Sequence, residues 1–242
     1  MHRFDAIRPF YDSEINQALH KVVNHPMMKA LMNFTFPDVL DDVWKEQLLR
    51  THSIRDFQCN FIYQSVQRVL EKSSDGLTTS GFENLEPNTS YLFISNHRDI
   101  LLDTTLLNTA LFEHNLTMTA SAIGDNLVKM PFLNTLAKLN RNFLVQRGLA
   151  PREMLQSSKL LSEYIGQLLL HENRSVWIAQ REGRTKDGKD ETNPGILKML
   201  GMGSDEKNLM DYFKKIKIVP VSISYEYDPT DALKMPQLMA EA

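Results

Sequence analysis

The chain has 242 residues, of which 42% are hydrophobic and 24% charged, so it can bury the core of a globular domain with a small appendage. Its net charge of −3 excludes binding of polyanions over the whole surface, and any contact with nucleic acid or a membrane must come from a local patch. The single cysteine, Cys59, cannot form an internal disulfide, which fits a reducing compartment.

The first part of the chain carries the spacing of helices. Between residues 10 and 72, apolar side chains recur at three- and four-residue steps. The run Ser-Ser-Asp-Gly at residues 73–76 then interrupts this pattern with turn-forming residues. We therefore predict a helical N-terminal subdomain over residues 1–76 and a second domain over residues 77–242.

The second domain alternates short apolar runs with helical segments. The strand candidates are residues 91–95, 142–146, 175–180 and 216–224. The helical segments are residues 100–113, 131–139, 151–170 and 204–215. Such alternation predicts an α/β fold with a mixed, largely parallel sheet flanked by helices. The last residues give no clear helix stop, as expected if a further C-terminal element followed.

The run Ser-Asn-His-Arg-Asp-Ile-Leu-Leu-Asp at residues 95–103 follows the first strand candidate. His97 stands at the strand end, where a general base could lie, and a base needs a partner that fixes its tautomer. Asp103 interrupts an apolar helical stretch and is one candidate partner. Asp99 has a structural alternative, since it could cap the helix that begins at Ile100.

Two other readings of this run fail. The His-Arg-Asp triplet also opens the catalytic loop of protein kinases, but that loop needs an asparagine where this chain has Thr104. A metal site made of His97, Asp99 and Asp103 lacks a second His or Cys at ligand spacing, so we predict no metal.

Basic residues gather in two short loops after strand candidates. Arg147 and Arg184 each stand beside a glycine, and the planar guanidinium matches phosphate bidentately. We therefore predict that these two arginines bind a phosphorylated substrate. Lys186 and Lys189 are more typical of a solvated charged loop.

Four segments, taken in order, resemble the sequence blocks of the glycerolipid acyltransferases, the PlsC-like lysophosphatidate and glycerol-3-phosphate acyltransferases. The resemblance covers roughly residues 78–228. The four blocks are Asn96-His97 with its downstream Asp, Phe143 to Arg147, Glu182-Gly183-Arg184-Thr185, and Val219-Pro220-Val221. Each is weak alone, but four in this order and spacing are strong evidence. The resemblance implies a glycerol-3-phosphate acyltransferase-like fold.

The sequence departs from the family pattern at two places. Five residues separate His97 from Asp103 where the family usually has four, and Leu102 occupies the usual position. The third block is one residue short, because Arg184 directly follows Gly183. These departures predict a divergent branch and bear on the acceptor more than on the reaction type.

The resemblance implies that His97, oriented by Asp103, takes the proton of an acceptor hydroxyl. That oxygen then attacks the thioester of acyl-CoA or acyl-carrier protein, a co-substrate, and no cofactor is needed. Arg147 and Arg184 would hold the phosphate of a lysophospholipid or glycerol phosphate acceptor, such as 1-acylglycerol-3-phosphate in phospholipid biosynthesis. The remaining residues implied to bind substrate shape the phosphate loop or the site near the acyl donor, and they are Glu182, Gly183, Thr185 and Pro220.

The resemblance also bears on partners and location. We expect a peripheral enzyme at the cytoplasmic face of the membrane, with no transmembrane helix and no nucleic-acid partner. The apolar side chains of the N-terminal helices could rest on the bilayer or pack on the domain, and they are Met27, Met28, Leu31, Met32 and Phe34. Two alternatives remain, namely an acyltransferase of the same fold with a non-glycerophosphate acceptor and a non-catalytic lipid-binding protein.

Overall fold

The structure is a computed structural model that describes residues 3–185, 188–206 and 208–241. The chain divides into two compact units, which we describe separately. The first unit contains residues 1–82 and 123–147, and the second contains residues 83–122 and 148–242. The boundary at residue 76 stays a prediction, because residues 1–76 belong to the first unit together with a later segment.

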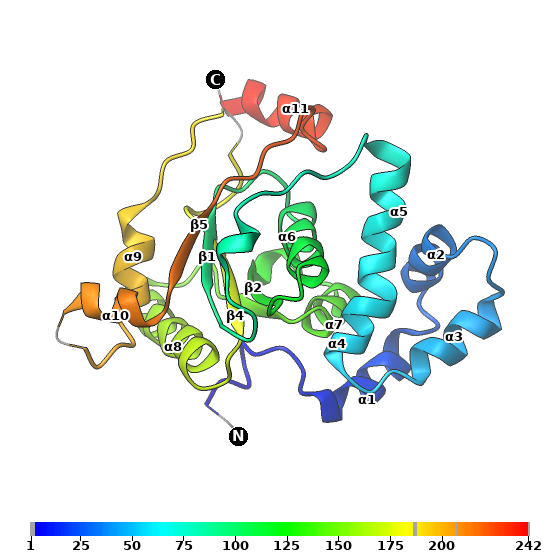
Figure 1. Cartoon of the computed structure of the whole chain (residues 1–242), viewed down its shortest axis with the longest axis horizontal. Helices are drawn as coiled ribbons and strands as arrows, with labels where there is room; N and C mark the ends of the chain where they lie inside the picture. The colour runs from blue at the N-terminus through cyan, green and yellow to red at the C-terminus, as the bar shows by residue number, and fades with distance from the viewer. Residues whose placement is uncertain (1–2, 186–187, 207, 242) are drawn as a thin grey trace. The chain divides into compact units, whose positions relative to one another are not determined.

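The first unit is mostly helical, as the spacing of its apolar residues predicts. Its elements up to residue 73 are α1 (Asp12–Val22), α2 (Pro26–Thr35), α3 (Asp41–Leu49), α4 (Ile54–Phe57), the π-helix η1 (Gln58–Ile62) and α5 (Tyr63–Ser73) (Figure 1). Its later elements are the 3₁₀ turn η3 (Asp125–Leu127), α7 (Pro131–Leu139) and β3 (Asn142–Val145). A short 3₁₀ turn, η2 (Phe82–Asn84), begins where this unit ends.

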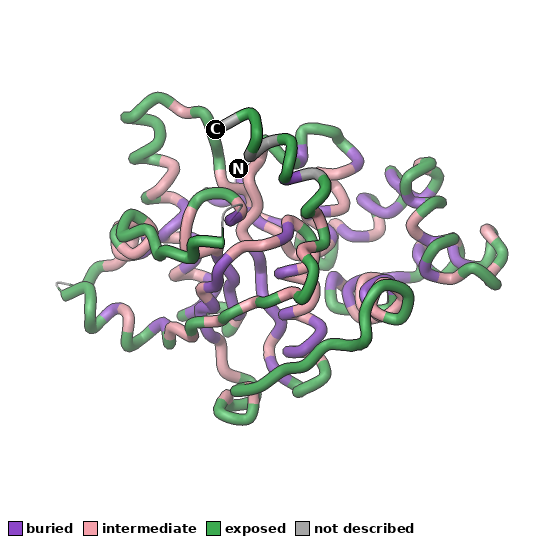
Figure 2. Tube along the Cα trace, turned by 90° about the horizontal axis from the view of Figure 1, so that it is seen from above, coloured by how far each residue is buried: buried purple, intermediate pink, exposed green. Residues whose placement is uncertain are grey.

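The core of the first unit is built from the buried sides of these helices. Trp44, Phe57 and Leu48 are fully buried there. The same core takes in Met28 and Met32, and Leu31 packs against it. Packing on the unit, rather than on a bilayer, therefore accounts for three of the five apolar residues predicted to form a face. Buried positions, purple in Figure 2, alternate with exposed green ones along the helices.

The second unit carries the parallel strands and the helices around them. Its strands are β1 (Leu92–Ser95), β2 (Thr119–Gly124, whose last two residues belong to the first unit), β4 (Ser175–Ala179) and β5 (Ile218–Val221). Its helices are α6 (Leu102–Glu113), α8 (Pro151–Leu170), α9 (Pro194–Gly201), α10 (Leu209–Lys215) and α11 (Asp231–Glu241) (Figure 1).

The sheet has the strand order β3-β2-β4-β1-β5. β1 lies between β4 and β5 and is parallel to both, with Phe93 opposite Trp177 on one side and Val219 on the other. β2 is also parallel to β4. The predicted α/β class is therefore confirmed. In a parallel sheet the carboxyl ends of the strands meet at one edge, and β1 delivers His97 to that edge.

Candidate active site

His97 lies in the loop that joins β1 to α6, which we call the His97 loop (residues 96–101). Its imidazole is largely enclosed, with 14% of the side chain exposed. The edge of this ring meets Trp177 of β4, with ring centroids 5.5 Å apart. Trp177 is itself fixed, because its indole N–H donates to Ser95 Oγ at 2.9 Å. The buried indole of Trp177 therefore helps to hold the imidazole in its orientation.

Asp103, in the first turn of α6, is fully buried and satisfied by donors. Its Oδ2 lies 2.8 Å from His97 Nδ1 and also accepts the backbone N–H groups of Arg98 and Asp99 at 2.7 and 3.1 Å. Its Oδ1 accepts the hydroxyl of Tyr225 at 2.9 Å. A buried carboxylate is costly unless hydrogen bonds replace its water, and here they do.

This geometry sets the tautomer of His97. Asp103 Oδ2 already accepts two backbone N–H groups and acts only as an acceptor, so His97 Nδ1 carries the hydrogen of the shared bond. Nε2 is then the unprotonated nitrogen in the neutral ring. The arrangement leaves a nitrogen able to take a proton and a negative charge that stabilises the imidazolium formed.

Asp99 has a different task in the same loop. Its Oδ1 accepts the backbone N–H groups of Leu101 and Leu102, both at 2.9 Å. These are orphan donors at the start of α6, so Asp99 caps the helix. The ambiguity between the two carboxylates is thereby resolved in favour of Asp103 as the contact of His97. The loop accommodates the extra residue between His97 and Asp103 without breaking that contact.

The described residues after β4, 181–185 and 188–190, which we call the 181–190 segment, are hydrogen-bonded to the His97 loop. The backbone N–H of Thr185 donates to the His97 carbonyl at 2.8 Å, and its hydroxyl donates to Asp190 Oδ1 at 3.0 Å. Asp190 also accepts Asn96 Nδ2 at 3.3 Å and pairs with Arg98. The first and third sequence blocks therefore meet in space, as the carboxyl ends of neighbouring parallel strands must.

The remaining residues of the third block lie in the same segment. Glu182 and Gly183 are exposed, and Gly183 has φ +73°, in the left-handed region that favours glycine. The guanidinium of Arg184 is half-buried and donates to Thr230 Oγ1 at 2.8 Å. Lys189 is exposed, and Lys186 lies outside the described residues.

The two other predicted site residues have separate settings. Arg147 is an exposed residue of the first unit, where its backbone N–H donates to Asp125 Oδ1 at 3.1 Å. Pro220 lies on the edge strand β5, opposite Ile94 of β1. Proline has no backbone N–H and is tolerated on an edge strand. The parts that these two residues play in substrate binding remain predictions.

Sequence reasoning missed three polar residues that reach this site from the end of the chain. They are Tyr225, Thr230 and Lys234, which bond to Asp103, Arg184 and the carbonyl of Arg98 respectively. Hydroxyl and lysine side chains more than a hundred residues from His97 carry no local signal of such contacts. Only the fold brings them together.

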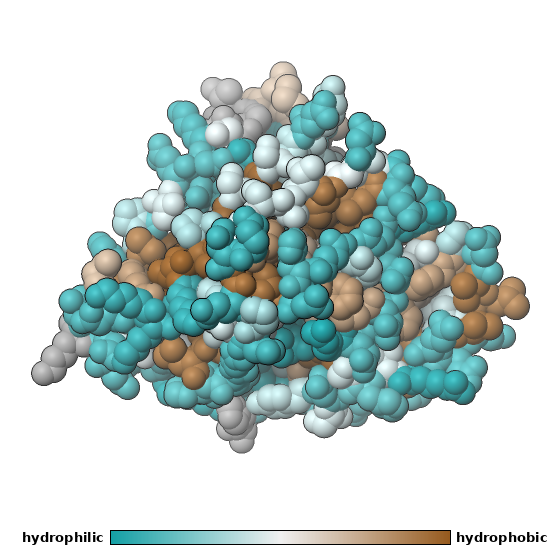
Figure 3. Space-filling model, in the orientation of Figure 1, coloured by the Kyte–Doolittle hydropathy of each residue, from teal (hydrophilic) through white to brown (hydrophobic). Residues whose placement is uncertain are grey.

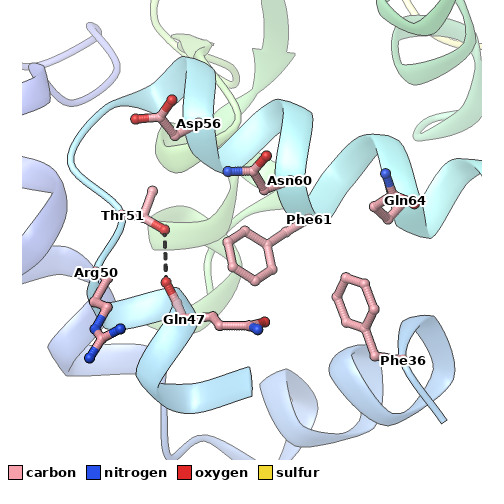
Figure 4. Close-up of a pocket in the computed structure, with 8 residues that line it drawn as sticks. All are labelled: Phe36, Gln47, Arg50, Thr51, Asp56, Asn60, Phe61 and Gln64. Atoms are coloured by element: carbon pink, nitrogen blue, oxygen red, sulfur yellow. Dashed lines mark hydrogen bonds between the residues drawn. The ribbon is translucent and has the colours of Figure 1, made fainter. Parts of the chain in front are cut away.

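A pocket of about 530 Å³ lies in the first unit, and none of the predicted site residues lines it (Figure 4). Phe36 and Phe61 form part of its wall, with their rings perpendicular and 6.2 Å apart.

Cys59, in the π-helix of the same unit, is half-buried, and burial raises the pKa of its thiol. A thiol that resists ionisation is a poor nucleophile, which fits a structural role for this cysteine.

Membrane-spanning helices and metal clusters are both absent from the part of the chain that the structure describes. None of the described helices is both long and apolar enough to cross a membrane. Within the same ranges, no group of three or more His, Cys, Asp or Glu side chains is placed to hold a metal ion.

Comparison with known proteins places this site in a family. The sequence profile described as Acyltransferase matches residues 76–224. No curated protein sequence matches the chain. Among solved structures, the chain is similar to the 1-acyl-sn-glycerophosphate (LPA) acyltransferase PlsC from Thermotoga maritima, with 11% identity and a TM-score of 0.38 over 95% of this chain and 93% of the other.

The family match spans more than half of the chain and includes β1, the His97 loop, the 181–190 segment and β5. Membership sets aside the alternative of a non-catalytic lipid-binding protein. The chain belongs to the Acyltransferase family and is an acyl-transferring enzyme.

Proposed function

We propose that the enzyme transfers a fatty acyl group from a thioester to a hydroxyl of a glycerophospholipid precursor, such as 1-acylglycerol-3-phosphate, in phospholipid biosynthesis. The donor is acyl-CoA or acyl-carrier protein. The observation that carries the proposal is the 2.8 Å contact between His97 Nδ1 and the buried carboxylate of Asp103. This pair provides a proton acceptor at the carboxyl end of the sheet.

The reaction follows from the tautomer of His97. Nε2 removes the proton of the acceptor hydroxyl while the oxygen of that hydroxyl bonds to the carbonyl carbon of the thioester. The C–S bond then breaks, and the proton on Nε2 passes to the leaving thiolate, giving a thiol and the acyl ester. Asp103 stabilises the intermediate imidazolium throughout. No covalent acyl-enzyme is needed.

The 181–190 segment supports a phosphorylated acceptor. Arg184 donates to the Thr230 hydroxyl at 2.8 Å, and a guanidinium has five N–H donors, so others remain for a phosphate. Exposed Gly183 keeps the neighbouring backbone open to a ligand. We assign phosphate binding to Arg184, loop shaping to Glu182, Gly183 and Thr185, and the region near the acyl donor to Pro220, while phosphate binding by Arg147 stays a prediction from the sequence.

We also propose that the enzyme works at a membrane surface, from the cytoplasmic side. Its acceptor and product would carry acyl chains that belong in a bilayer. The first unit exposes large apolar side chains that its core does not bury, among them Met27, Phe34, Leu40 and Val43. Exposed apolar residues of this kind can enter the interface of a bilayer.

The direct test is a transfer assay with identified products. The purified chain is incubated with acyl-CoA or acyl-carrier protein and a panel of glycerol phosphates, lysophospholipids and non-phosphorylated acceptors, and the products are identified by mass spectrometry. We expect an acylated glycerophosphate. The His97→Ala variant should lose about 10²- to 10⁴-fold in rate, the usual contribution of a general base. His171→Ala, at the exposed end of α8, is the matched control.

Three results would contradict the proposal. Full turnover by the His97→Ala variant would exclude His97 as the base. Products formed only from non-phosphorylated acceptors would exclude the glycerophosphate acceptor and leave the alternative acceptor class. An absence of acyl transfer from every thioester would exclude both donors.

A further inference from the structure

The family match ends at residue 224, and the residues directly after it turn back toward the site. The stretch from Tyr225 to Lys234, which we call the 225–234 segment, begins four residues after the end of β5 and runs into the first turn of α11. Three of its side chains make hydrogen bonds to the His97 loop, to the first turn of α6 or to Arg184. All of these residues belong to the second unit.

Tyr225 makes the first of these contacts. Its hydroxyl donates to Asp103 Oδ1 at 2.9 Å, while Oδ2 of the same carboxylate faces His97. Burial, together with the negative charge of Asp103, raises the pKa of Tyr225 far above its ordinary value. The phenol therefore keeps its proton and acts as the donor. This bond fixes the plane of the carboxylate, because each oxygen has its own donors.

Thr230 makes the second contact. Its hydroxyl donates to Asp228 Oδ1, with 3.3 Å between the two oxygens, and the same hydroxyl oxygen accepts Arg184 Nη1 at 2.8 Å. The backbone N–H of Thr230 also donates to Asp228 Oδ1, at 2.9 Å. The Asp228 carboxylate thus orients the neutral hydroxyl of Thr230. That hydroxyl holds the guanidinium of Arg184 in position without neutralising its charge.

Lys234 makes the third contact and anchors the segment. It is 4% exposed, donates to the carbonyl of Arg98 at 2.8 Å and pairs with Asp228. Burial works to raise the pKa of Asp228, but the bonds from Lys234 and Thr230 outweigh it, so that the net change is a lowering. Lys234 thus links the Asp228 carboxylate to the His97 loop and holds this carboxylate and the loop together.

We propose that the 225–234 segment supplies two positioning residues, Tyr225 for the general base and Thr230 for the acceptor-binding arginine. Tyr225 acts through Asp103 on the chemical step. Thr230 acts through Arg184 on the affinity for the phosphorylated acceptor. The inference rests on the proposed function, and it extends the site beyond the residues that the family match covers.

Steady-state kinetics separate the two roles. Tyr225→Phe keeps the ring and removes the donor, and it should lower kcat by about 10- to 100-fold with little change in the acceptor KM, as expected for a lost hydrogen bond to a charged group. Thr230→Val keeps the shape and removes the acceptor, and it should raise the acceptor KM by about fivefold or more at nearly constant kcat. Tyr227→Phe, at an 80% exposed position, is the control.

Two further variants test whether each residue acts through its named partner. Tyr225→Phe should have almost no additional effect on kcat in an Asp103→Asn background, because the negative charge that Tyr225 orients is already absent there. Thr230→Ser restores the hydroxyl and should return the acceptor KM to the wild-type value. Additive losses with Asp103→Asn, or a raised KM in Thr230→Ser, would overturn the corresponding assignment.

An NMR measurement tests the role of Tyr225 without depending on turnover. The proton on His97 Nδ1 should give a low-field NMR signal that is absent from His97→Ala. Tyr225→Phe should shift that signal, and Tyr227→Phe should leave it in place. If the wild type transfers no acyl group but the shift is seen, the proposed function fails while the role of Tyr225 stands. If Tyr225→Phe changes neither kcat nor the signal, the inference about Tyr225 is wrong.

Discussion

At the scale of single residues, the site depends on two carboxylates that lie close together and do different work. Asp103 is fully buried and holds His97, whereas Asp99 holds the start of α6. A carboxylate that contacts the base affects the rate of proton transfer. A carboxylate that caps a helix mainly affects the free energy of unfolding.

We predict that Asp103→Asn and Asp99→Ala separate these effects. In the Asp103→Asn variant, an uncharged amide replaces the carboxylate, so the negative charge that stabilises the imidazolium is lost and kcat should fall by about 10²- to 10⁴-fold. Asp99→Ala should cost about 1 kcal/mol in the free energy of unfolding, with a smaller loss of rate. Turnover assays and urea unfolding of both variants measure this. A larger rate loss in Asp99→Ala would mean that the orienting carboxylate is misidentified.

The contacts of the site that could be predicted from sequence are those between residues only a few positions apart. The sequence limits the partner of His97 to two nearby carboxylates, Asp99 and Asp103, which follow it by two and six positions, but it does not choose between them. The contact of Tyr225 with Asp103 could not be predicted, since it spans 122 positions and needs β5 beside β1. Likewise, nothing near Thr230 in the sequence points to Arg184.

At the scale of elements, the turn at Gly183 sets the path of the chain into Arg184 and Thr185. Its φ of +73° suits glycine and strains any other residue. Arg184 follows directly, so a change in the turn moves the guanidinium. Gly188 has a similar φ of +78° with open space around it, four residues beyond Arg184.

We predict that Gly183→Ala raises the acceptor KM several-fold more than Gly188→Ala does. Each substitution should cost about 1 kcal/mol of backbone strain, so their free energies of unfolding should fall by similar amounts. Acceptor titrations and urea unfolding provide the comparison. Equal KM values in the two variants would show that the Gly183 turn does not position Arg184.

The start of α1 should respond to acid. Glu14 accepts Arg8 at 2.6 and 2.9 Å and the backbone N–H of Tyr11 at 2.7 Å. The side-chain bond from Arg8 is the largest cause that lowers the pKa of Glu14 below its ordinary value of 4.5. A lowered pKa in the folded state adds stability above pH 4.5, and that stability is lost as the pH falls through the folded-state pKa.

We therefore predict that Glu14→Gln lowers the free energy of unfolding more at about pH 7 than in acid well below the ordinary value of 4.5, where the carboxyl of the wild type is protonated. Urea unfolding of the variant and the wild type at both pH values measures the difference. Glu71→Gln is the matched control, because Glu71 is more exposed and pairs with Arg68 at 3.3 Å. A difference that stays constant with pH would show that the ion pair contributes nothing through titration.

The strands show what apolar patterning predicts and what it misses. β1, β3, β4 and β5 each fall within a predicted apolar run. β2 (Thr119–Gly124) escaped prediction because its buried positions include hydroxyl residues, with Thr119 fully buried and Ser121 nearly so. These hydroxyls bond to each other at 3.1 Å, which satisfies them inside the sheet.

Two helices, α9 and α11, were also missed, whereas α10 falls within the predicted segment 204–215.

At the scale of the whole molecule, attachment to a membrane depends on what the surface exposes. The first unit buries Met28 and Met32 and leaves Leu40 77% exposed in the connection between α2 and α3. In Figure 3, brown atoms reach the surface over that connection. Val43, in the first turn of α3, is also exposed. Since the chain carries a net charge of −3, we expect apolar contact rather than overall charge to drive the proposed binding to a membrane.

We predict that Leu40→Glu with Val43→Glu lowers binding to phospholipid vesicles by about tenfold or more, because two apolar side chains can no longer enter the interface. Met154→Glu with Leu155→Glu on α8, also at largely exposed positions, is the matched control for the two added charges. Vesicle sedimentation measures binding, and turnover of water-soluble glycerol 3-phosphate measures the chemistry. Turnover should survive in the Leu40→Glu, Val43→Glu variant, because His97 and Asp103 lie in the other unit. Unchanged sedimentation of the Leu40→Glu, Val43→Glu variant would exclude this connection as the membrane contact, and an equal loss in the α8 control would attribute the effect to charge alone.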